Sequence, residues 1–185
     1  MWQAFVHRHG WRAYALPILV VLTAFEVLRL GQGAGATTPP VKVAAAAPTV
    51  TATPSPCAGN TAAQLVVVSI GKQRAWMCAA TAQVYTTAVT TGASDLGLAT
   101  PVGTWQVQDK QTNRYLVGPG YRDFVSYWVP FDGDFGFHDA RWQTMAYGSP
   151  DYRTQGSHGC VHLAAPAMAW LFGWARVGAT VTVQA

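Results

Sequence analysis

Charged side chains are scarce in this sequence, at 11% of 185 residues. Residues 1–56 contain four Lys or Arg and one Glu, whereas residues 57–185 contain eight Lys or Arg and seven Asp or Glu. The net charge of +4 is therefore largely a property of the N-terminal segment. No basic cluster follows a predicted helix face, so the sequence predicts no nucleic-acid partner.

Cysteine is also rare, with only Cys57, Cys78 and Cys160. The absence of any CxxC pair gives little support to a structural zinc site. In an exported protein, three cysteines fit one disulfide plus one free functional thiol. Cys57 opens the folded part and Cys78 ends a predicted strand, so a Cys57–Cys78 bridge would hold that edge of the domain. The alternative is that Cys78 is a small buried side chain and Cys57 a free surface thiol.

Long apolar runs are absent except near the N-terminus. Residues 1–12 carry Arg8 and Arg12 with no acidic residue, and residues 13–25 are almost purely apolar, which is typical of a signal sequence. Extended to Leu30, the run would span about 27 Å as a helix, close to the thickness of a bilayer core. A cleaved signal peptide and a retained signal anchor both imply export.

The predicted organisation has three parts. Residues 1–32 form a signal peptide or signal-anchor helix, with residues 13–30 as the candidate membrane anchor; a small-residue cleavage site follows at residues 34–36. Residues 33–56 are rich in Ala, Thr and Pro and contain no aromatic residue, so we expect a disordered linker. Residues 57–185 form one folded domain.

Short segments rich in β-branched and aromatic residues dominate the sequence after Cys57, and only Pro166 to Trp174 has the pattern of a helix. The predicted strands cover residues 65–70, 74–78, 84–90, 104–108, 124–129 and 179–183. The sequence thus predicts a mainly β fold, a mostly antiparallel sandwich or half-barrel with one helix.

The most informative motif is Ser157-His158-Gly159-Cys160-Val161-His162, with His138 twenty-two residues before the cysteine. A cysteine is a nucleophile as its thiolate, and a nearby histidine supplies a general base. Small residues beside the cysteine let backbone N–H groups point at an oxyanion. The pattern predicts an acyl-transfer site with Cys160 as nucleophile and His138 as base.

This motif resembles the signature of the L,D-transpeptidase (YkuD) family, in which S/T-H-G-C is preceded by an aromatic–histidine step. Here that step is Phe137-His138, and a Thr-Gly…Thr-Pro-x-Gly stretch matches at residues 91–103. The likeness extends from about Gln64 to the C-terminus. It implies an L,D-transpeptidase-like β-sandwich or half-barrel with one short helix after the catalytic cysteine, and makes residues 57–185 the catalytic domain.

The resemblance also implies roles for other residues. The backbone carbonyl of Asp139 would orient the His138 imidazole, because the Asp139 side chain would point to the opposite face of an extended segment. His158 and Gly159 would shape the active-site turn. The N–H groups of Gly159 and Cys160 are the candidate oxyanion donors.

Substrate contacts are predicted at four positions, Ser157, His162, Tyr127 and Trp128. Family members more often carry Arg or Asn where this chain has His162, which puts carboxylate recognition through that position in doubt. Ser157 would hold the turn by a local hydrogen bond. For Tyr127 and Trp128 the alternative is ordinary core packing.

The implied function is that of an exported acyltransferase that cross-links peptidoglycan. Cys160 would attack a tetrapeptide stem and release its terminal D-Ala, and an amine of a second stem would take the resulting thioester to give a 3→3 cross-link. No cofactor or metal is expected, and carbapenem-type β-lactams are expected to acylate the cysteine. The implied location is extracytoplasmic, in the cell wall or on the outer face of the plasma membrane of a bacterium.

Three alternatives are left open. With water as acceptor, the same site would be an L,D-carboxypeptidase. His138, His158, Cys160 and His162 together offer four nitrogen and sulfur donors, the ligand types that zinc prefers. The domain could also be a wall-binding module without catalysis.

Overall fold

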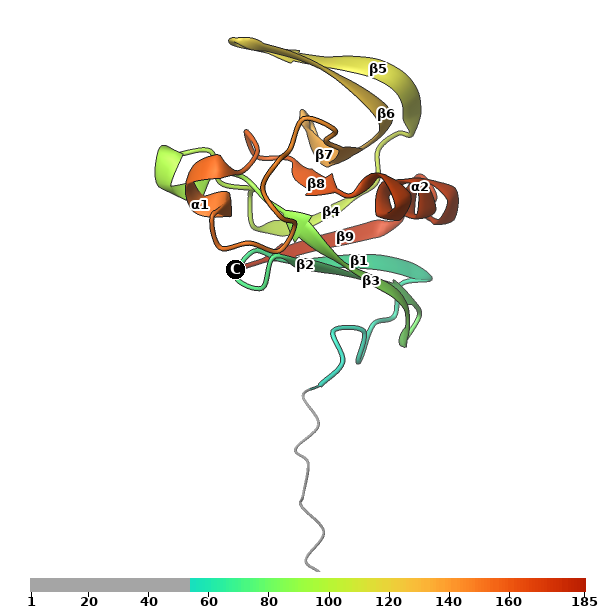
Figure 1. Ribbon diagram of the computed structural model, residues 1–185. Helices are drawn as coiled ribbons and strands as arrows, with labels where there is room; N and C mark the ends of the chain where they lie inside the picture. The colour runs from blue at the N-terminus through green and yellow to red at the C-terminus, as the bar shows by residue number, and fades with distance from the viewer. Residues whose placement is uncertain (1–53) are drawn as a thin grey trace, which may run out of the picture. The chain divides into compact units, whose positions relative to one another are not determined.

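Nine strands form one curled sheet in residues 54–185, the part of the chain that this computed structural model describes. The predicted signal peptide or anchor (1–32), and the predicted linker (33–56) except residues 54–56, lie outside the described residues. The strand order is β4-β9-β1-β2-β3-β8-β7-β6-β5 (Figure 1). The elements are β1 (Gln64–Ser69), β2 (Arg74–Ala79), β3 (Ala82–Thr90), the 3-10 turn η1 (Ser94–Leu96), β4 (Gly103–Gln106), β5 (Gln111–Gly118), β6 (Tyr121–Asp132), β7 (Phe135–Asp139), α1 (Tyr152–Gln155), β8 (Val161–Leu163), α2 (Ala165–Trp174) and β9 (Thr180–Gln184).

The first half of the sheet is built around β1. The valines at 66–68 are buried, and β1 lies between the antiparallel β2 and the parallel β9. A central strand that is covered on both faces favours such a continuous apolar run. β4 pairs with the other edge of β9. The last strand of the chain, β9, therefore lies in the same half of the sheet as the first strand, β1.

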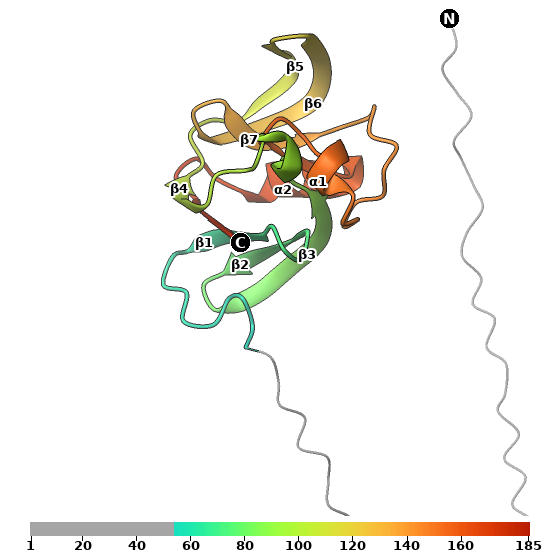
Figure 2. The same ribbon diagram turned by 90° about the vertical axis from the view of Figure 1, so that its left-hand side faces the viewer.

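Strand β3 joins the two halves of the sheet. Its residues 82–88 pair with β2, whereas Val89 and Thr90 pair with β8. From β8 the second half continues through the parallel neighbour β7 to the antiparallel β6 and β5. The β5–β6 hairpin projects away from the rest of the domain in both views (Figures 1 and 2).

Helix α2 fills the inside of the curl. Pro166 stands in its first turn, where the missing N–H would have no helical partner. Ala167, Met168 and Leu171 belong to one core cluster with residues from both halves of the sheet, and Figure 2 shows α2 between β1–β3 and the hairpin. Burying Met168 and Leu171 contributes about 1.5–3 kcal/mol each, which fixes the helix just after the cysteine motif.

The predicted mainly β fold with one short helix after the cysteine is confirmed. Five elements go beyond the prediction, namely β5, β7, β8, α1 and the turn η1. β5 is mostly polar and forms as an edge strand along the twelve-residue β6, so its sequence shows no buried pattern. β8 has three residues and α1 has four, too few for a periodic signal. No helix within residues 54–185 is long and apolar enough to cross a bilayer.

The predicted disulfide is confirmed: Cys57 is bonded to Cys78, and Cys160 is free. The bridge packs with Val67 and Trp76 in a small apolar cluster. It ties the segment before β1 to the end of β2, across a sequence separation of 21 residues.

Removing this bridge should lower the free energy of unfolding by about 3 kcal/mol, because the unfolded chain regains the freedom that a closed loop of this length denies it. Urea unfolding of Cys57→Ser/Cys78→Ser beside the wild type measures the change. Cys160→Ala, which leaves the bridge intact, is the matched control. A double variant with the midpoint and slope of the wild type would contradict the prediction.

Candidate active site

Two histidines and the free cysteine converge where β7 and β8 run side by side. The two strands are parallel and pair His138 with His162, so both side chains leave the sheet on one face. Their ring centroids lie 4.5 Å apart. Cys160 ends the turn that leads into β8 at Val161. The parallel pairing thus gathers three chemically active side chains.

Hydrogen bonds from a distant segment hold the turn that carries the cysteine. The N–H of Ser157 donates to Thr91 O at 3.0 Å, and the Ser157 carbonyl accepts from Ala93 N–H at 2.9 Å. Between these two, Gly92 has no room for a side chain, since a Cβ would overlap the Leu98 carbonyl oxygen. The Thr-Gly step far upstream in the sequence therefore braces this turn.

Gly159 shapes the turn itself. Its φ of +117° is a conformation that favours glycine, and a Cβ there would overlap the Phe135 ring. Its N–H donates to Ser157 Oγ at 3.0 Å, and that hydroxyl donates to Cys160 O. Because the Gly159 N–H is engaged inside the turn, it does not fit the oxyanion role expected from the sequence, and the Cys160 N–H is left as the candidate donor.

His138 is buried and has a defined tautomer. Its Nδ1 lies 3.0 Å from Asp139 O. Because a carbonyl can only accept, Nδ1 carries the proton and Nε2 keeps its lone pair. Burial lowers the pKa of His138 below its ordinary value, while the hydrogen bond and charge of Asp139 act in the opposite direction. A neutral imidazole with a free Nε2 can accept a proton from a thiol.

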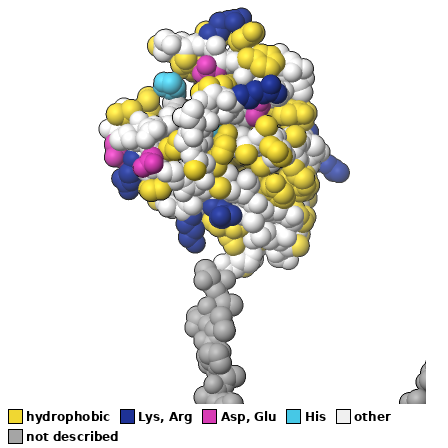
Figure 3. Space-filling view, in the orientation of Figure 1, with side chains coloured by type: hydrophobic (Ala, Val, Ile, Leu, Met, Phe, Trp, Pro, Cys, Tyr) yellow, Lys and Arg dark blue, Asp and Glu magenta, His cyan; other side chains and the backbone are white. Residues whose placement is uncertain are grey.

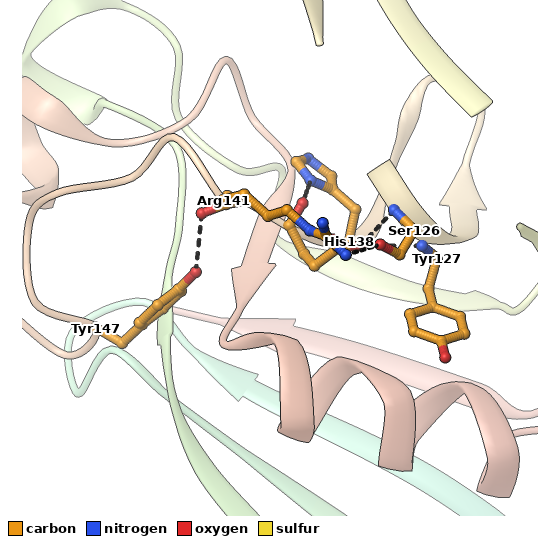
Figure 4. Close-up of polar contacts among 7 residues, drawn as sticks. Ser126, Tyr127, His138, Arg141 and Tyr147 are labelled. Carbon is orange, nitrogen blue, oxygen red and sulfur yellow. Dashed lines mark hydrogen bonds and ion pairs between the residues drawn. The ribbon is translucent and has the colours of Figure 1, made fainter. Parts of the chain in front are cut away.

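The Asp139 carboxylate secures the neighbouring strand rather than the imidazole, and its partners Ser126, Tyr127 and Arg141 are labelled in Figure 4. Its Oδ1 accepts the N–H groups of Ser126 at 2.8 Å and Tyr127 at 2.9 Å, which directly precede Trp128, the first residue of β6 that pairs with β7. Arg141 places Nε 3.6 Å from Oδ2 and donates from Nη2 to Ser126 Oγ. Hydrogen bonds to a charged group contribute about 1.5–3 kcal/mol each, so this carboxylate anchors β6 beside the histidine strand.

The Cys160 thiol is protonated in the resting site. Its Sγ lies 3.6 Å from Asp134 O, which can only accept, so the S–H donates to it. Burial raises the pKa of Cys160 to about 11; a hydrogen bond from the Gly136 backbone opposes that shift, and the charge of Asp134 adds to it. These surroundings thus favour the neutral thiol and the neutral imidazole over a thiolate–imidazolium pair.

Two cavities meet at Cys160. The smaller cavity has a volume of about 100 Å³, and both His138 and His162 line it. The larger cavity has a volume of about 420 Å³, and Trp128 lines it. Three residues line both cavities, namely Cys160, Leu116 of β5 and Tyr121 of β6. The β5–β6 hairpin therefore forms a wall that the two cavities share at the sulfur.

The two cavities differ in charge. The smaller contains the carboxylate of Asp123 and no Lys or Arg. The larger contains Asp134 and also Arg114, whose guanidinium lies 5.9 Å from the centroid of the Trp128 ring. On the face shown in Figure 3, charged side chains are scattered among apolar ones, and several basic and acidic side chains lie next to one another.

The remaining predicted site residues separate into two groups. His158 is exposed, lines the smaller cavity and stacks on Tyr121 at 4.8 Å, which joins the turn to the hairpin. Trp128 lines the larger cavity. Tyr127 lines neither cavity, and its ring packs on Phe172 of α2, because adjacent strand residues point to opposite faces. The structure therefore corrects the substrate contact expected at Tyr127 to core packing.

Three residues of the smaller cavity and its rim are absent from the sequence prediction, Asp123, Trp142 and Gln143. The Trp142 ring lies 5.9 Å from His138, and Gln143 Oε1 lies 2.9 Å from His162 Nδ1. Their nearness to His138 in the sequence is the one signal that could have indicated them. Asp123 carries no such signal, because only the fold of the hairpin brings it to the cavity.

No three or more His, Cys, Asp or Glu side chains are arranged to hold a metal ion in the described part of the chain. The geometry therefore does not support the zinc alternative.

Comparison with known proteins identifies the family. The family model described as the YkuD L,D-transpeptidase catalytic domain matches residues 63–183. The chain belongs to the YkuD family of L,D-transpeptidases. Most of the described residues, and every site residue discussed above, lie inside this YkuD domain.

Individual relatives agree with this assignment. The putative L,D-transpeptidase YciB of Bacillus subtilis is 26% identical over 112 residues, which are 57% of each chain. The crystal structure of the Enterococcus faecium L,D-transpeptidase C442S mutant is 30% identical with a TM-score of 0.62, over 65% of this chain and 49% of that one. The Ldtfm–avibactam carbamoyl enzyme is also 30% identical with a TM-score of 0.62, over 66% and 49%. The chain thus spans about half the length of these relatives.

The neutral resting pair predicts the pH dependence of thiol reactivity. Because the thiolate is the reactive form, alkylation of Cys160 by iodoacetamide should rise about tenfold per pH unit and level off only near pH 11, above the usual cysteine value of about 8.5. Mass spectrometry of the free thiol over a pH series measures the rate. A plateau already below pH 7 would show a thiolate–imidazolium pair and contradict the neutral assignment.

Proposed function

We propose that this YkuD-family protein is an exported cysteine L,D-transpeptidase that forms 3→3 cross-links in peptidoglycan. Cys160 attacks the carbonyl that precedes the terminal D-Ala of a tetrapeptide stem, and the stem is held as a thioester. An amine of a second stem then takes the acyl group. The observation that carries the proposal is the position of Cys160, beside a neutral histidine and at the meeting point of two cavities.

The protons in the first step follow from the neutral pair. The thiol proton passes to His138 Nε2 as sulfur attacks, so the sulfur gains its nucleophilic charge only during the step. His138 then protonates the departing amine of D-Ala, which leaves a thioester and a neutral imidazole. The Cys160 N–H is positioned by the turn to stabilise the oxyanion. His138 therefore acts as a base in the reaction rather than by ionising the resting sulfur.

The two cavities support transfer between two substrates. A transferase has to bring a donor and an acceptor to the same atom from different directions, whereas hydrolysis needs only one peptide site and water. The larger cavity suits the donor stem, because Arg114 can attract its carboxylate groups. The smaller cavity suits an amine, because Asp123 is its one charged side chain among the lining residues. Hydrolysis of the same thioester would instead give an L,D-carboxypeptidase.

Two further findings support the proposed location and inhibitors. A Cys57–Cys78 disulfide is stable in oxidising compartments outside the cytosol, which agrees with export by the predicted N-terminal segment. The related Ldtfm forms a carbamoyl enzyme with avibactam. We infer that Cys160 is also acylated by β-lactams of the carbapenem type, whose strained ring amide offers an electrophilic carbonyl.

The variant Cys160→Ala should lose both cross-linking of tetrapeptide stems and covalent capture of a carbapenem, because no other thiol is free in the described domain. Intact-mass spectrometry detects the adduct, and chromatography of the stem products detects cross-links. Circular dichroism should show the wild-type fold, since a methyl group replaces the thiol. An adduct on the variant would mean that another residue is the nucleophile. Release of D-Ala by the wild type without any cross-linked product would favour the carboxypeptidase.

The variant His138→Ala should slow acylation by about 10²- to 10⁴-fold, the usual contribution of a positioned base. The loss should shrink as pH rises towards 11, because the Cys160 thiol then ionises without help. Stopped-flow or mass-based acylation rates at several pH values measure both effects. Acylation at the wild-type rate at pH 7 would remove His138 from the mechanism.

A further inference from the structure

Gln143 has a fixed orientation beside the active site. Its Nε2 donates to Met145 O at 3.0 Å and to Thr90 Oγ1 at 2.9 Å. A backbone carbonyl accepts hydrogen bonds and cannot donate them, so the amide nitrogen must face Met145. The amide oxygen Oε1 consequently faces His162, 2.9 Å from its Nδ1.

This orientation decides the tautomer of His162. An amide oxygen only accepts, so His162 Nδ1 carries the proton and Nε2 keeps its lone pair. Burial, and then the neighbouring His138 and His158, lower the pKa of His162 well below its ordinary value, so the ring is neutral. This position thus presents an uncharged hydrogen-bond acceptor.

The side chain of His162 lines the smaller cavity and also a neighbouring one that Trp142 and Gln143 line. Within residues 54–185, the one buried side-chain nitrogen or oxygen that lacks a partner is Asp139 Oδ2. His162 Nε2 has no hydrogen bond to the protein, yet it does not belong to these buried atoms without a partner. The His162 side chain lines the smaller cavity together with Cys160 and His138. Two neutral imidazoles therefore stand 4.5 Å apart, each with Nδ1–H held by the protein and Nε2 free.

We propose that His162, held by Gln143, orients the acceptor amine by accepting one of its N–H bonds while His138 receives the other proton. The inference rests on the proposed function and concerns its second step. The amine nitrogen bonds to the thioester carbon, and the bond from that carbon to sulfur breaks. His138 takes one amine proton and returns it to the departing sulfur, which restores the thiol. The second N–H, bonded to His162, becomes the N–H of the new amide.

The experiment separates the two half-reactions in the full-length protein. A tetrapeptide stem forms the acyl-enzyme without acceptor, and a stem that offers a primary amine is then added, with intact mass followed in both steps. In His162→Phe, which keeps the ring shape and has no acceptor, aminolysis should fall about 10- to 100-fold more than acylation. His162→Asn, which restores an oxygen acceptor, should recover part of this loss.

Gln143 is a positioning residue, and its variants test the link to the tautomer. In Gln143→Leu the imidazole is no longer fixed, so aminolysis should fall less than in His162→Phe, and nitrogen NMR of His162 should change from a single Nδ1–H form to a mixture. Gln83 is an exposed glutamine on β3, so Gln83→Leu is the matched control. It should leave the aminolysis rate and the NMR spectrum of His162 unchanged. The NMR measurement needs only folded wild-type protein, so it holds even if a variant is unstable.

Distinct results would overturn the two proposals. If no acyl-enzyme forms on Cys160 with any stem, the proposed function fails. If the acyl-enzyme forms but His162→Phe aminolyses it at the wild-type rate, or loses acylation and aminolysis equally, the role of His162 fails alone. A wild-type spectrum with the proton on His162 Nε2 would also overturn it.

Discussion

The parallel pairing of β7 with β8 is the constraint on which the site depends. These two short strands bring together His138 and His162, and the turn entering β8 supplies Cys160. A pair of parallel strands needs a long connection, because the chain has to return to the starting end of the sheet. Here the connection contains the loop with Trp142 and Gln143, helix α1 and the cysteine turn. The residues that surround the two imidazoles thus come from the segment that the parallel pairing requires.

Burial favours the neutral forms of His138, His162 and Cys160. Two adjacent buried imidazoles and a thiol would be costly to hold as ions, because a protein interior solvates charge poorly. The structure instead satisfies each histidine through Nδ1 and gives the thiol a carbonyl acceptor. The same surroundings strengthen hydrogen bonds to a charge that forms during reaction.

The β5–β6 hairpin turns a sheet edge into a two-sided site. Its residues Leu116 and Tyr121 form the wall shared by both cavities. The carboxylate of Asp139 holds the β6 strand of this hairpin through two backbone N–H groups. Asp139 therefore has two separate functions, since its carbonyl fixes the tautomer of His138 and its carboxylate fixes β6. The strand alternation that separates these two groups explains why neither one could do both.

The sequence by itself determined the mainly β class and the Ser-His-Gly-Cys motif with its upstream His138, and it favoured the Cys57–Cys78 pairing, because these depend on local pattern and on residue types that are rare in this chain. Only the tertiary structure decided that Tyr127 packs in the core, that the Gly159 N–H is engaged, and that Asp123 and Gln143 belong to the site. Such features depend on which face of a strand a side chain occupies and on hydrogen bonds between segments far apart in the sequence, as between Thr91 and Ser157. Short or polar elements such as β5 and β8 owe their existence to their neighbours, since their own residues bury too little surface to specify a strand.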